Sequence, residues 1–376
     1  MPSRTALQRY ALEANRRFGW LFPASLRQRV ARRLFPPRPP RPPDARKRVE
    51  ILVDVVGSCN LRCPSCPVGN MGLSNGTGLL DKDLFSRIME KAAREYNVVL
   101  VSLFNWAEPM LHPDLPSFIR IVKGYDIPCA ISTNLNVLRN IDEVLRAGPD
   151  EFRISLSGYT QEVYGHTHVG GNIERVKSNM VKVAEAKRRT MSRETYIYVY
   201  YHKYLHNLSD IASMKSFSEQ LGFGWLENWA YYMPIENMVR LAEGRLEPNE
   251  LAFVNDTFAL PIHKALKAAE RYRHEPCRLL EEQIVLDLKG NLLLCCGVYD
   301  YANNTLGSFL DMTPSDVERA KQYHSTCDSC MAHGIHRYFE YYWHPELRAT
   351  YDELSAENLK MREGRTCLPV IQNANP

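Results

Sequence analysis

The sequence predicts an α/β protein built on a partial (β/α)6 TIM-like barrel, with a small cysteine-rich domain toward the C-terminus. From Arg48 onward, short β-branched or aromatic runs alternate with longer amphipathic stretches, and most of the cysteines fall into two groups. The 376 residues, 45% hydrophobic and 24% charged, can bury a sizeable core. We expect four regions: 1–47, the barrel at 48–274, the cysteine-rich domain at 275–335 and a tail at 336–376.

The first 47 residues are predicted to form a basic amphipathic helix and a Pro-rich linker. Leu26, Val30 and Leu34 recur every four residues, which is the spacing of a helix with one apolar face. Six prolines between Pro36 and Pro43 cannot donate backbone hydrogen bonds and favour a stiff, extended connector. We expect this helix to dock on the rest of the chain or to be solvated, and contact with a membrane surface or an acidic partner is the alternative.

Charge and composition restrict the class of protein. The net charge of +4 does not indicate nucleic-acid binding, because the positive excess lies before residue 50. There is no run of eighteen apolar residues, and the first residues lack the apolar core of a secretory signal. We therefore expect a cytoplasmic protein in which grouped cysteines bind metal rather than form disulfides.

Six strands are expected in the barrel region, with helices between them. The strands are 49–56, 98–104, 128–134, 151–157, 195–201 and a weaker one within 223–232. Helical patterns occupy 81–96 and 172–189, and a helix from Leu251 to Tyr272 follows the last strand. Six units make an open barrel, whose working residues should lie on loops at the carboxyl ends of the strands.

Three cysteines, Cys59, Cys63 and Cys66, follow the first strand in the segment CNLRCPSC. Thiolates on so short a loop must surround a common centre, and they can bind three irons of a 4Fe-4S cluster while the fourth iron stays open to an outside ligand. A tetrahedral zinc site would need a fourth protein ligand, and no histidine or further cysteine lies nearby in the sequence. Zinc or a structural role is the alternative.

The segment CNLRCPSC resembles the cluster-binding signature of the radical S-adenosylmethionine (SAM) superfamily, whose fold is a partial six-unit barrel. FNWAEPMLHPDL, after the second strand, resembles the Gly-Glu-Pro segment of that family, with Ala107 where glycine is common. The resemblance implies that this loop and the polar ends of the third and fourth strands bind SAM. The residues implied are Trp106, Ala107, Glu108, Ser132, Asn134, Ser155 and Ser157. A helix-start carboxylate and turn-forming serines are the alternatives.

The second cysteine group contains two separated pairs. Twelve residues lie between Cys277 and Gly290 and four between Gly290 and Cys295, and the segment CDSC later supplies Cys327 and Cys330. This pattern resembles the auxiliary-cluster domain of the superfamily, called SPASM in its larger form and twitch in its shortened form. The resemblance implies an auxiliary 4Fe-4S cluster on these four cysteines, and a zinc ribbon is the alternative.

Other residues of this region leave alternatives open. The full SPASM pattern would place cysteines where His336 and Glu340 stand, which favours the twitch form with one auxiliary cluster. Cys296 could replace the preceding cysteine as a ligand. Cys367 and His336 could complete a second cluster with the CDSC cysteines. Cys129, inside the third strand, is predicted to be a small buried hydrophobic residue.

Candidates for substrate contact lie at the ends of the fifth and sixth strands. The catalytic candidates are His202, Lys203, Glu227 and Tyr231, and Tyr200 and Trp229 are further candidates for contact. Alternate residues of a strand face opposite sides, so about half of these can point into the barrel. An inward histidine, lysine or glutamate could accept the proton that an oxidation releases.

The resemblance implies that SAM is cleaved reductively, with an electron from a flavodoxin- or ferredoxin-type donor, to a 5′-deoxyadenosyl radical that abstracts a hydrogen atom from a substrate carbon. We expect the oxidation of a small metabolite, natural-product intermediate or peptide, because an auxiliary cluster with four thiolates has no free iron and can accept an electron. Thioether or carbon–carbon crosslinking of a ribosomal peptide, and epimerisation with hydrogen returned by Cys296 or Cys367, are alternatives. A non-catalytic structural or redox-sensing metal protein is an alternative of another class.

Overall fold

The computed structural model describes residues 46–192, 194–322 and 324–363. The chain divides into two compact units, Met1–Ala45 and Arg46–Pro376, and the described residues all belong to the second. The predicted basic helix, the Pro-rich linker and Cys367 therefore lie outside the described residues. Within these residues, no helix has both the length and the apolar character needed to cross a membrane.

The described strands form one nine-stranded sheet in the order β6-β5-β4-β3-β2-β1-β7-β8-β9. Strands β1 to β6 pair in parallel with their neighbours in chain order, and helices connect them. Their bounds are β1 Arg48–Val53, β2 Asn97–Ser102, β3 Cys129–Thr133, β4 Glu151–Leu156, β5 Tyr196–Lys203 and β6 Gly224–Trp229. The predicted α/β class and the partial barrel of six parallel units are thus confirmed.

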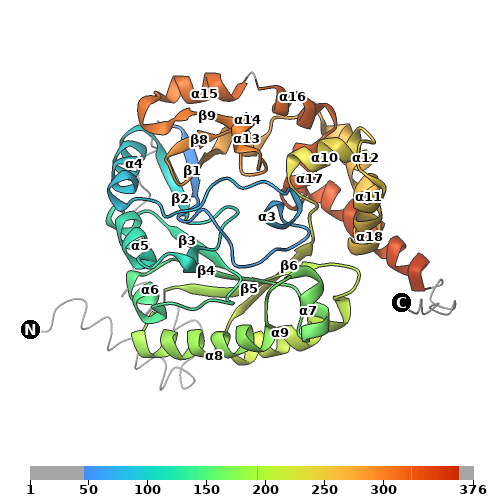
Figure 1. Ribbon diagram of the computed structural model, residues 1–376, viewed down its shortest axis with the longest axis horizontal. Coiled ribbons are helices and arrows are strands. Elements are labelled where there is room, and N and C mark those ends of the chain that lie inside the picture. The colour runs from blue at the N-terminus through green and yellow to red at the C-terminus, as the bar shows by residue number, and fades with distance from the viewer. Residues whose placement is uncertain (1–45, 193, 323, 364–376) are drawn as a thin grey trace, which may run out of the picture. The chain divides into compact units, whose positions relative to one another are not determined.

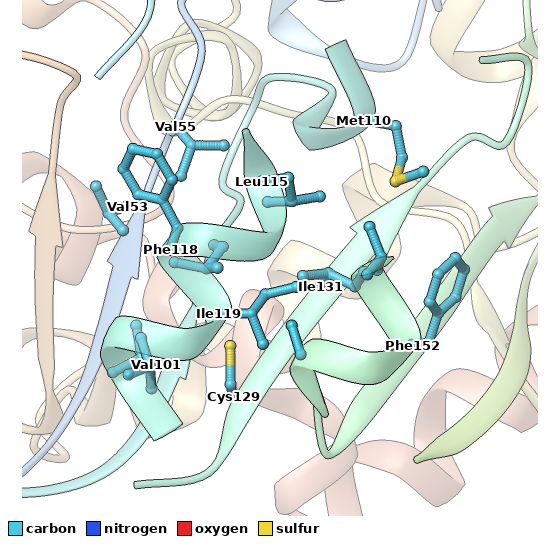
Figure 2. Close-up of a cluster of buried hydrophobic side chains, with 14 of the residues drawn as sticks. Val53, Val55, Val101, Met110, Leu115, Phe118, Ile119, Cys129, Ile131 and Phe152 are labelled. Atoms are coloured by element: carbon cyan, nitrogen blue, oxygen red, sulfur yellow. The ribbon is translucent and has the colours of Figure 1, made fainter. Parts of the chain in front are cut away.

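Helices cover the outer side of these strands (Figure 1). They are α4 (Lys82–Glu95), α5 (Leu115–Gly124), α6 (Ile141–Ala147), α8 (Ile173–Thr190) and α9 (Ile211–Gln220). Helix α4 begins where the carboxylate of Asp81 accepts a hydrogen bond from the Leu84 N–H at 2.8 Å, as an N-cap residue does. The helices bury their apolar faces against the sheet, and Figure 2 shows Phe118 and Cys129 in this core. Cys129 is fully buried, as predicted.

The cysteine-rich region continues the same sheet. Strand β7 (Gln283–Leu286) pairs in parallel with β1, and β8 (Asn291–Leu293) and β9 (Thr305–Ser308) follow as antiparallel strands. The helices of this region are α13 (Arg278–Glu282), α14 (Tyr301–Asn304), α15 (Pro314–Gln322) and α16 (Ser325–Ala332). Since the first cysteine loop follows β1, the pairing of β7 with β1 brings the second cysteine region alongside it.

A second core forms around the helices that follow β6. These are α10 (Ile235–Ala242), α11 (Pro248–Thr257) and α12 (Ile262–Ala269). The predicted helix over 251–272 is wrong, because the chain breaks between α11 and α12, where Pro261 supplies no N–H and disfavours helix at the residue before it.

The predicted tail is folded as far as the structure describes it, up to Glu363. It contains α17 (Ile335–Glu340) and α18 (Pro345–Glu363), and the Tyr351 hydroxyl of α18 donates to the Ala265 carbonyl of α12 at 2.9 Å. The short helices α3 (Pro67–Asn70) and α7 (Gln161–Thr167) complete the α-helices of the described residues. The 3-10 turns are η2 (Pro109–Leu111), η3 (Leu208–Asp210), η4 (Glu270–Tyr272), η5 (Phe309–Asp311) and η6 (Tyr341–Trp343).

Candidate active site

A cavity of about 420 Å³ lies at the carboxyl ends of the parallel strands. Cys59, Cys63 and Cys66 line it. All seven residues that the sequence assigns to SAM also line it: Trp106, Ala107, Glu108, Ser132, Asn134, Ser155 and Ser157. The loop after β1, the loop after β2 and the ends of β3 and β4 therefore converge on one space.

Backbone hydrogen bonds give the cysteine loop its curl. The Cys66 N–H donates to the Cys63 carbonyl at 3.0 Å, and the Gly69 N–H donates to the Cys66 carbonyl at 2.9 Å. A Cβ at Gly69 would lie 2.2 Å from the Cys63 carbonyl oxygen, so only glycine permits helix α3 to pack this closely on the loop. The Leu61 N–H donates to the Cys59 sulfur at 3.4 Å. The loop is shaped by its own backbone around the cysteines.

The three thiols influence one another. Burial raises the pKa of Cys59 to about 11 and that of Cys66 to about 12. Burial also raises the pKa of Cys63, and the neighbouring Cys66 and Cys59 thiols raise it further. Thiols in this environment stay protonated unless a metal centre binds them as thiolates.

The donor set fits a cluster with one open iron. Three thiols from one loop face the same cavity, and a cubane binds each of its thiolates through a different iron. Among the described residues, no three His, Cys, Asp or Glu side chains are close enough to hold a single metal ion. That finding concerns a mononuclear site, whereas a cubane separates its ligands more widely.

Asp54, at the end of β1, holds the loop after β2. Its buried carboxylate accepts hydrogen bonds from the backbone N–H groups of Asn105 at 2.8 Å, Trp106 at 3.1 Å and Ala107 at 3.0 Å. Burial raises the pKa of Asp54, and these hydrogen bonds oppose the shift. The sequence analysis missed this residue, although an aspartate inside the apolar run VEILVDVV was a signal.

Glu108 begins η2, so the structure shows the helix-start carboxylate that was the alternative for this residue. The carboxylate accepts from the Asn134 N–H at 2.7 Å and from the Met110 N–H at 3.0 Å. Glu108 nevertheless lines the cavity, and burial raises its pKa to about 7. A cap and a ligand contact are compatible, since a carboxylate offers about four lone-pair sites.

Several polar atoms in the cavity wall lack partners. The Asn134 side-chain amide is not one of these, because it donates to the Asn60 side-chain oxygen at 3.0 Å and lies 3.6 Å from the Cys59 sulfur, next to the predicted cluster. Within the described residues, the hydroxyls of Ser157 and Tyr231 and the amide oxygen of Gln283 are buried without a hydrogen bond. Buried polar atoms are almost always paired in folded proteins, so this wall fits a polar ligand.

The structure brings only some of the candidates for substrate contact to the cavity. Tyr200, His202 and Tyr231 line the cavity. Lys203 and Glu227 do not, and their side chains form an ion pair with each other at 3.7 Å. Burial lowers the pKa of His202 to about 3, and the nearby charge of Arg153 contributes, so His202 is a neutral imidazole at neutral pH.

The cavity also contains residues that the sequence analysis did not single out. Arg153 of β4 occupies the inward alternation that continues through Ser155, a signal present in the sequence. Phe339, Tyr342 and Trp343 of the predicted tail form another part of the wall. Nothing in the local sequence indicates that these aromatic residues return to the barrel.

The second cysteine group forms a separate hollow. Cys277, Cys295, Cys327 and Cys330 all line it. The pKa of the Cys330 thiol is raised by burial and by the other three thiols, which shows that the four lie close together. Cys296 lines the main cavity instead. The adjacent Cys295 and Cys296 therefore line different cavities.

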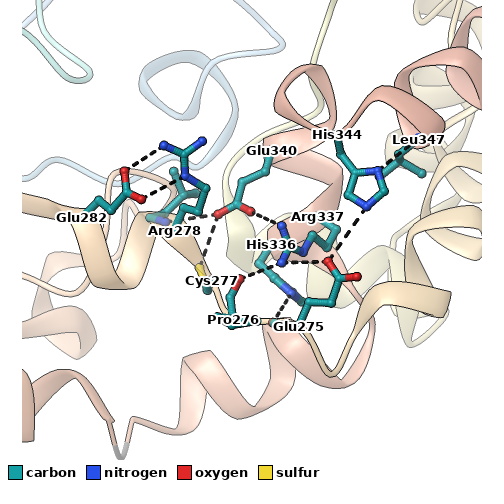
Figure 3. A network of polar contacts seen from close by, with 11 residues as sticks. Glu275, Pro276, Cys277, Arg278, Glu282, His336, Arg337, Glu340, His344 and Leu347 are labelled. Atoms are coloured by element: carbon teal, nitrogen blue, oxygen red, sulfur yellow. Dashed lines mark hydrogen bonds and ion pairs between the residues drawn. The ribbon is translucent and has the colours of Figure 1, made fainter.

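Helix α17 binds the loop that contains Cys277 (Figure 3). The Arg337 guanidinium donates to the Pro276 carbonyl at 2.8 Å and pairs with Glu340 at 3.0 Å. The Glu340 carboxylate accepts from the Leu279 N–H at 3.1 Å and lies 3.8 Å from the Cys277 sulfur.

His336 belongs to the same network and also lines the auxiliary hollow. Its Nε2 lies 3.1 Å from the Glu275 carbonyl oxygen. The two positions that hold cysteine in the full SPASM pattern, His336 and Glu340, therefore fix the Cys277 loop here.

Residues 53–211 match the family model described as Radical SAM superfamily. This segment, which contains the first cysteine group, is thus similar to that superfamily, and the match covers less than half of the chain. The S-adenosylmethionine-bound crystal structure of SuiB from Streptococcus suis is similar in fold, with a TM-score of 0.51 and 14% identity over 77% of this chain and 72% of that chain. At that identity the likeness concerns the fold alone.

Two curated relatives match part of the chain. A probable GTP 3′,8-cyclase of Methanococcus maripaludis (strain C5) is 31% identical over 135 residues, which is 35% of this chain and 44% of the relative. The tungsten-containing aldehyde ferredoxin oxidoreductase cofactor-modifying protein of Pyrococcus furiosus is 28% identical over 141 residues, 36% of this chain and 39% of the relative. The chain spans less than half the length of these relatives.

Proposed function

We propose that this protein is a radical SAM enzyme that abstracts a hydrogen atom from a substrate carbon and completes an oxidation. The observation that supports the proposal best is the cavity of about 420 Å³, which brings the three cysteines of the first group together with all seven predicted SAM residues. A cluster and SAM bound there would supply one-electron chemistry that can break an unactivated carbon–hydrogen bond.

The roles of the chain's own residues follow from their positions. Cys59, Cys63 and Cys66 would hold the cluster, and the carboxylate of Glu108 would receive the amino group of SAM. Asp54 would keep the loop of Glu108 in place through three backbone hydrogen bonds. The aromatic wall from the tail would exclude water, which a reactive carbon radical requires.

The position of the second cysteine group supports oxidation as the outcome. We propose a twitch-like auxiliary 4Fe-4S cluster on Cys277, Cys295, Cys327 and Cys330. Leu279 lines both the main cavity and the auxiliary hollow, and the adjacent Cys295 and Cys296 line one each. The wall between the two spaces is therefore one residue thick at these points. An electron from the substrate would have a short path to the auxiliary cluster, and a flavodoxin- or ferredoxin-type donor would supply the first cluster.

The test compares two cysteine variants after anaerobic reconstitution. Cys63→Ala should abolish the conversion of SAM to 5′-deoxyadenosine, because the first cluster loses a ligand. Cys129→Ala is the matched control, since Cys129 is buried outside both cysteine sites. Cleavage that persists in Cys63→Ala would reject the proposal. Zinc in place of iron in the parent protein would favour a structural or sensing metal protein.

Epimerisation is a second candidate, and the position of Cys296 in the main cavity favours it. In that reaction the substrate would lose a hydrogen atom to the 5′-deoxyadenosyl radical and the Cys296 S–H would return one to the opposite face. An electron from the reduced auxiliary cluster and a proton from solvent would then restore the thiol. Reaction in deuterium oxide separates the candidates. Epimerisation places deuterium on the product carbon and Cys296→Ala prevents this, whereas oxidation leaves no solvent hydrogen there.

A further inference from the structure

Arg153 stands in an unusual setting for a charged residue. It pairs with Ser132 in the parallel register of β3 and β4, and its Nε donates to the Ser132 hydroxyl at 2.8 Å. The centre of its guanidinium lies 4.6 Å from the ring centroid of Phe104 and 5.1 Å from that of Tyr200. Two rings and one hydrogen bond therefore fix the position of this side chain.

Arg153 forms no ion pair with the acidic residues near it, and Glu151, two residues earlier on the same face of β4, accepts a hydrogen bond from the Tyr198 hydroxyl at 3.2 Å. Among the described residues, no carboxylate lies within ion-pair distance of its guanidinium. It is the one arginine or lysine in the described lining, and the one acidic residue there, Glu108, already accepts two backbone hydrogen bonds. An arginine side chain carries a positive charge, and among the described residues only the Nε of Arg153 has a hydrogen-bond partner, so its two Nη groups are available to a ligand.

We propose that Arg153 binds an anionic group of the substrate, a carboxylate or a phosphate. This inference rests on the proposed function and narrows the substrate class to organic acids and phosphate esters. A guanidinium presents two parallel N–H donors that match both anions, and a guanidinium already fixed by its surroundings loses little further freedom when it binds.

Arg153 lies deeper in the barrel than the SAM residues nearest the cysteine loop, and it is level with Ser132, the one SAM residue that it hydrogen-bonds. Asn134, which touches the Cys59 sulfur, lies two residues beyond Ser132 toward the carboxyl edge of the sheet. Ser155 likewise lies two residues beyond Arg153. Two strand residues span roughly 6.6 Å. Arg153 therefore lies one inward layer below Asn134 and Ser155, at the lower edge of the predicted SAM site, where a substrate bound beneath SAM would reach it.

The experiment uses the full chain with its clusters loaded, and calorimetry first measures SAM binding. Inorganic phosphate and, separately, acetate are then titrated into the SAM-bound protein. We expect at least one of these probes to bind the parent protein and to bind Arg153→Met about tenfold more weakly or worse, because a charge-assisted pair is lost. SAM affinity should stay within about threefold. Arg153→Lys should recover part of the affinity.

A matched control is Arg120→Met, which removes an exposed arginine paired with Glu143 on the outer helices. It should leave the binding of both probes unchanged. Equal probe affinity in the parent protein and Arg153→Met, or no binding of either probe to the parent, would overturn the proposal. Loss of SAM affinity in Arg153→Met would also overturn it, since the carboxylate of SAM would then be the partner. SAM cleavage without substrate, assayed in parallel, tests the proposed function separately.

Discussion

The two cysteine groups reach their sites in different ways. Cys59, Cys63 and Cys66 lie on one loop whose backbone hydrogen bonds suffice to gather them. The second group comes from the start of α13, the end of β8 and helix α16, so only the folded chain brings its members together. A local site depends on its loop, whereas a site assembled from distant segments depends on the packing that holds those segments.

The two sites also differ in what surrounds them. The first group opens on a cavity with unpaired polar atoms in its wall. The second is lined mainly by apolar side chains, with Ile235, Leu294 and Met331 among them, and by the polar residues Thr326 and His336. An open polar site suits a cluster that binds a cofactor, and an enclosed site suits a cluster that only transfers electrons.

The largest expected effect separates the two sites by metal content. In the double variant Cys277→Ala with Cys330→Ala, iron should fall from about eight to about four per chain, because one of two cubanes is lost. SAM cleavage to 5′-deoxyadenosine should persist without complete substrate oxidation. Elemental analysis and product chromatography measure both quantities. An unchanged iron content would show that these cysteines do not hold an auxiliary cluster.

The second largest expected effect tests whether the contacts of helix α17 stabilise the second cysteine site. Arg337→Met removes a guanidinium that pairs with the fully buried Glu340. Leaving that carboxylate unpaired should lower the free energy of unfolding by about 3 kcal/mol or more. Denaturant unfolding measures it, with Arg120→Met as the exposed control at about 0.5 kcal/mol. Equal losses in the two variants would mean that the α17 network does not stabilise the Cys277 loop.

A smaller effect concerns pH at the first site. Burial raises the pKa of Glu108 to about 7, so its carboxyl group is protonated below that pH and cannot receive an ammonium group. SAM affinity should therefore rise with pH from 6 to 8, by at most about tenfold per unit below the pKa. Stability of the ligand-free protein should change in the opposite sense, because a raised carboxyl pKa lowers stability as pH increases past the unfolded value. In Glu108→Gln, neither SAM affinity nor stability should show this pH dependence. A pH dependence that persists in the variant would mean that another group titrates.

The difference between a local site and a site assembled from distant segments also decides how much of the molecule the sequence could predict. The six parallel strands and the first cysteine loop were accessible because alternation and spacing are local patterns. The helix predicted over 251–272 failed at Pro261, a local signal that was overlooked. The pairing of β7 with β1 and the return of Tyr342 and Trp343 to the cavity depend on contacts between distant segments, which no local pattern contains.

The first measurement is iron and sulfide per chain after anaerobic reconstitution, followed by incubation with SAM and a strong reductant while 5′-deoxyadenosine is quantified. We expect about eight irons and about eight sulfides per chain, and formation of 5′-deoxyadenosine. Zinc instead of iron, or a full iron complement without cleavage under any reductant, would contradict the central claim that the cavity lined by Cys59, Cys63 and Cys66 is a radical SAM site.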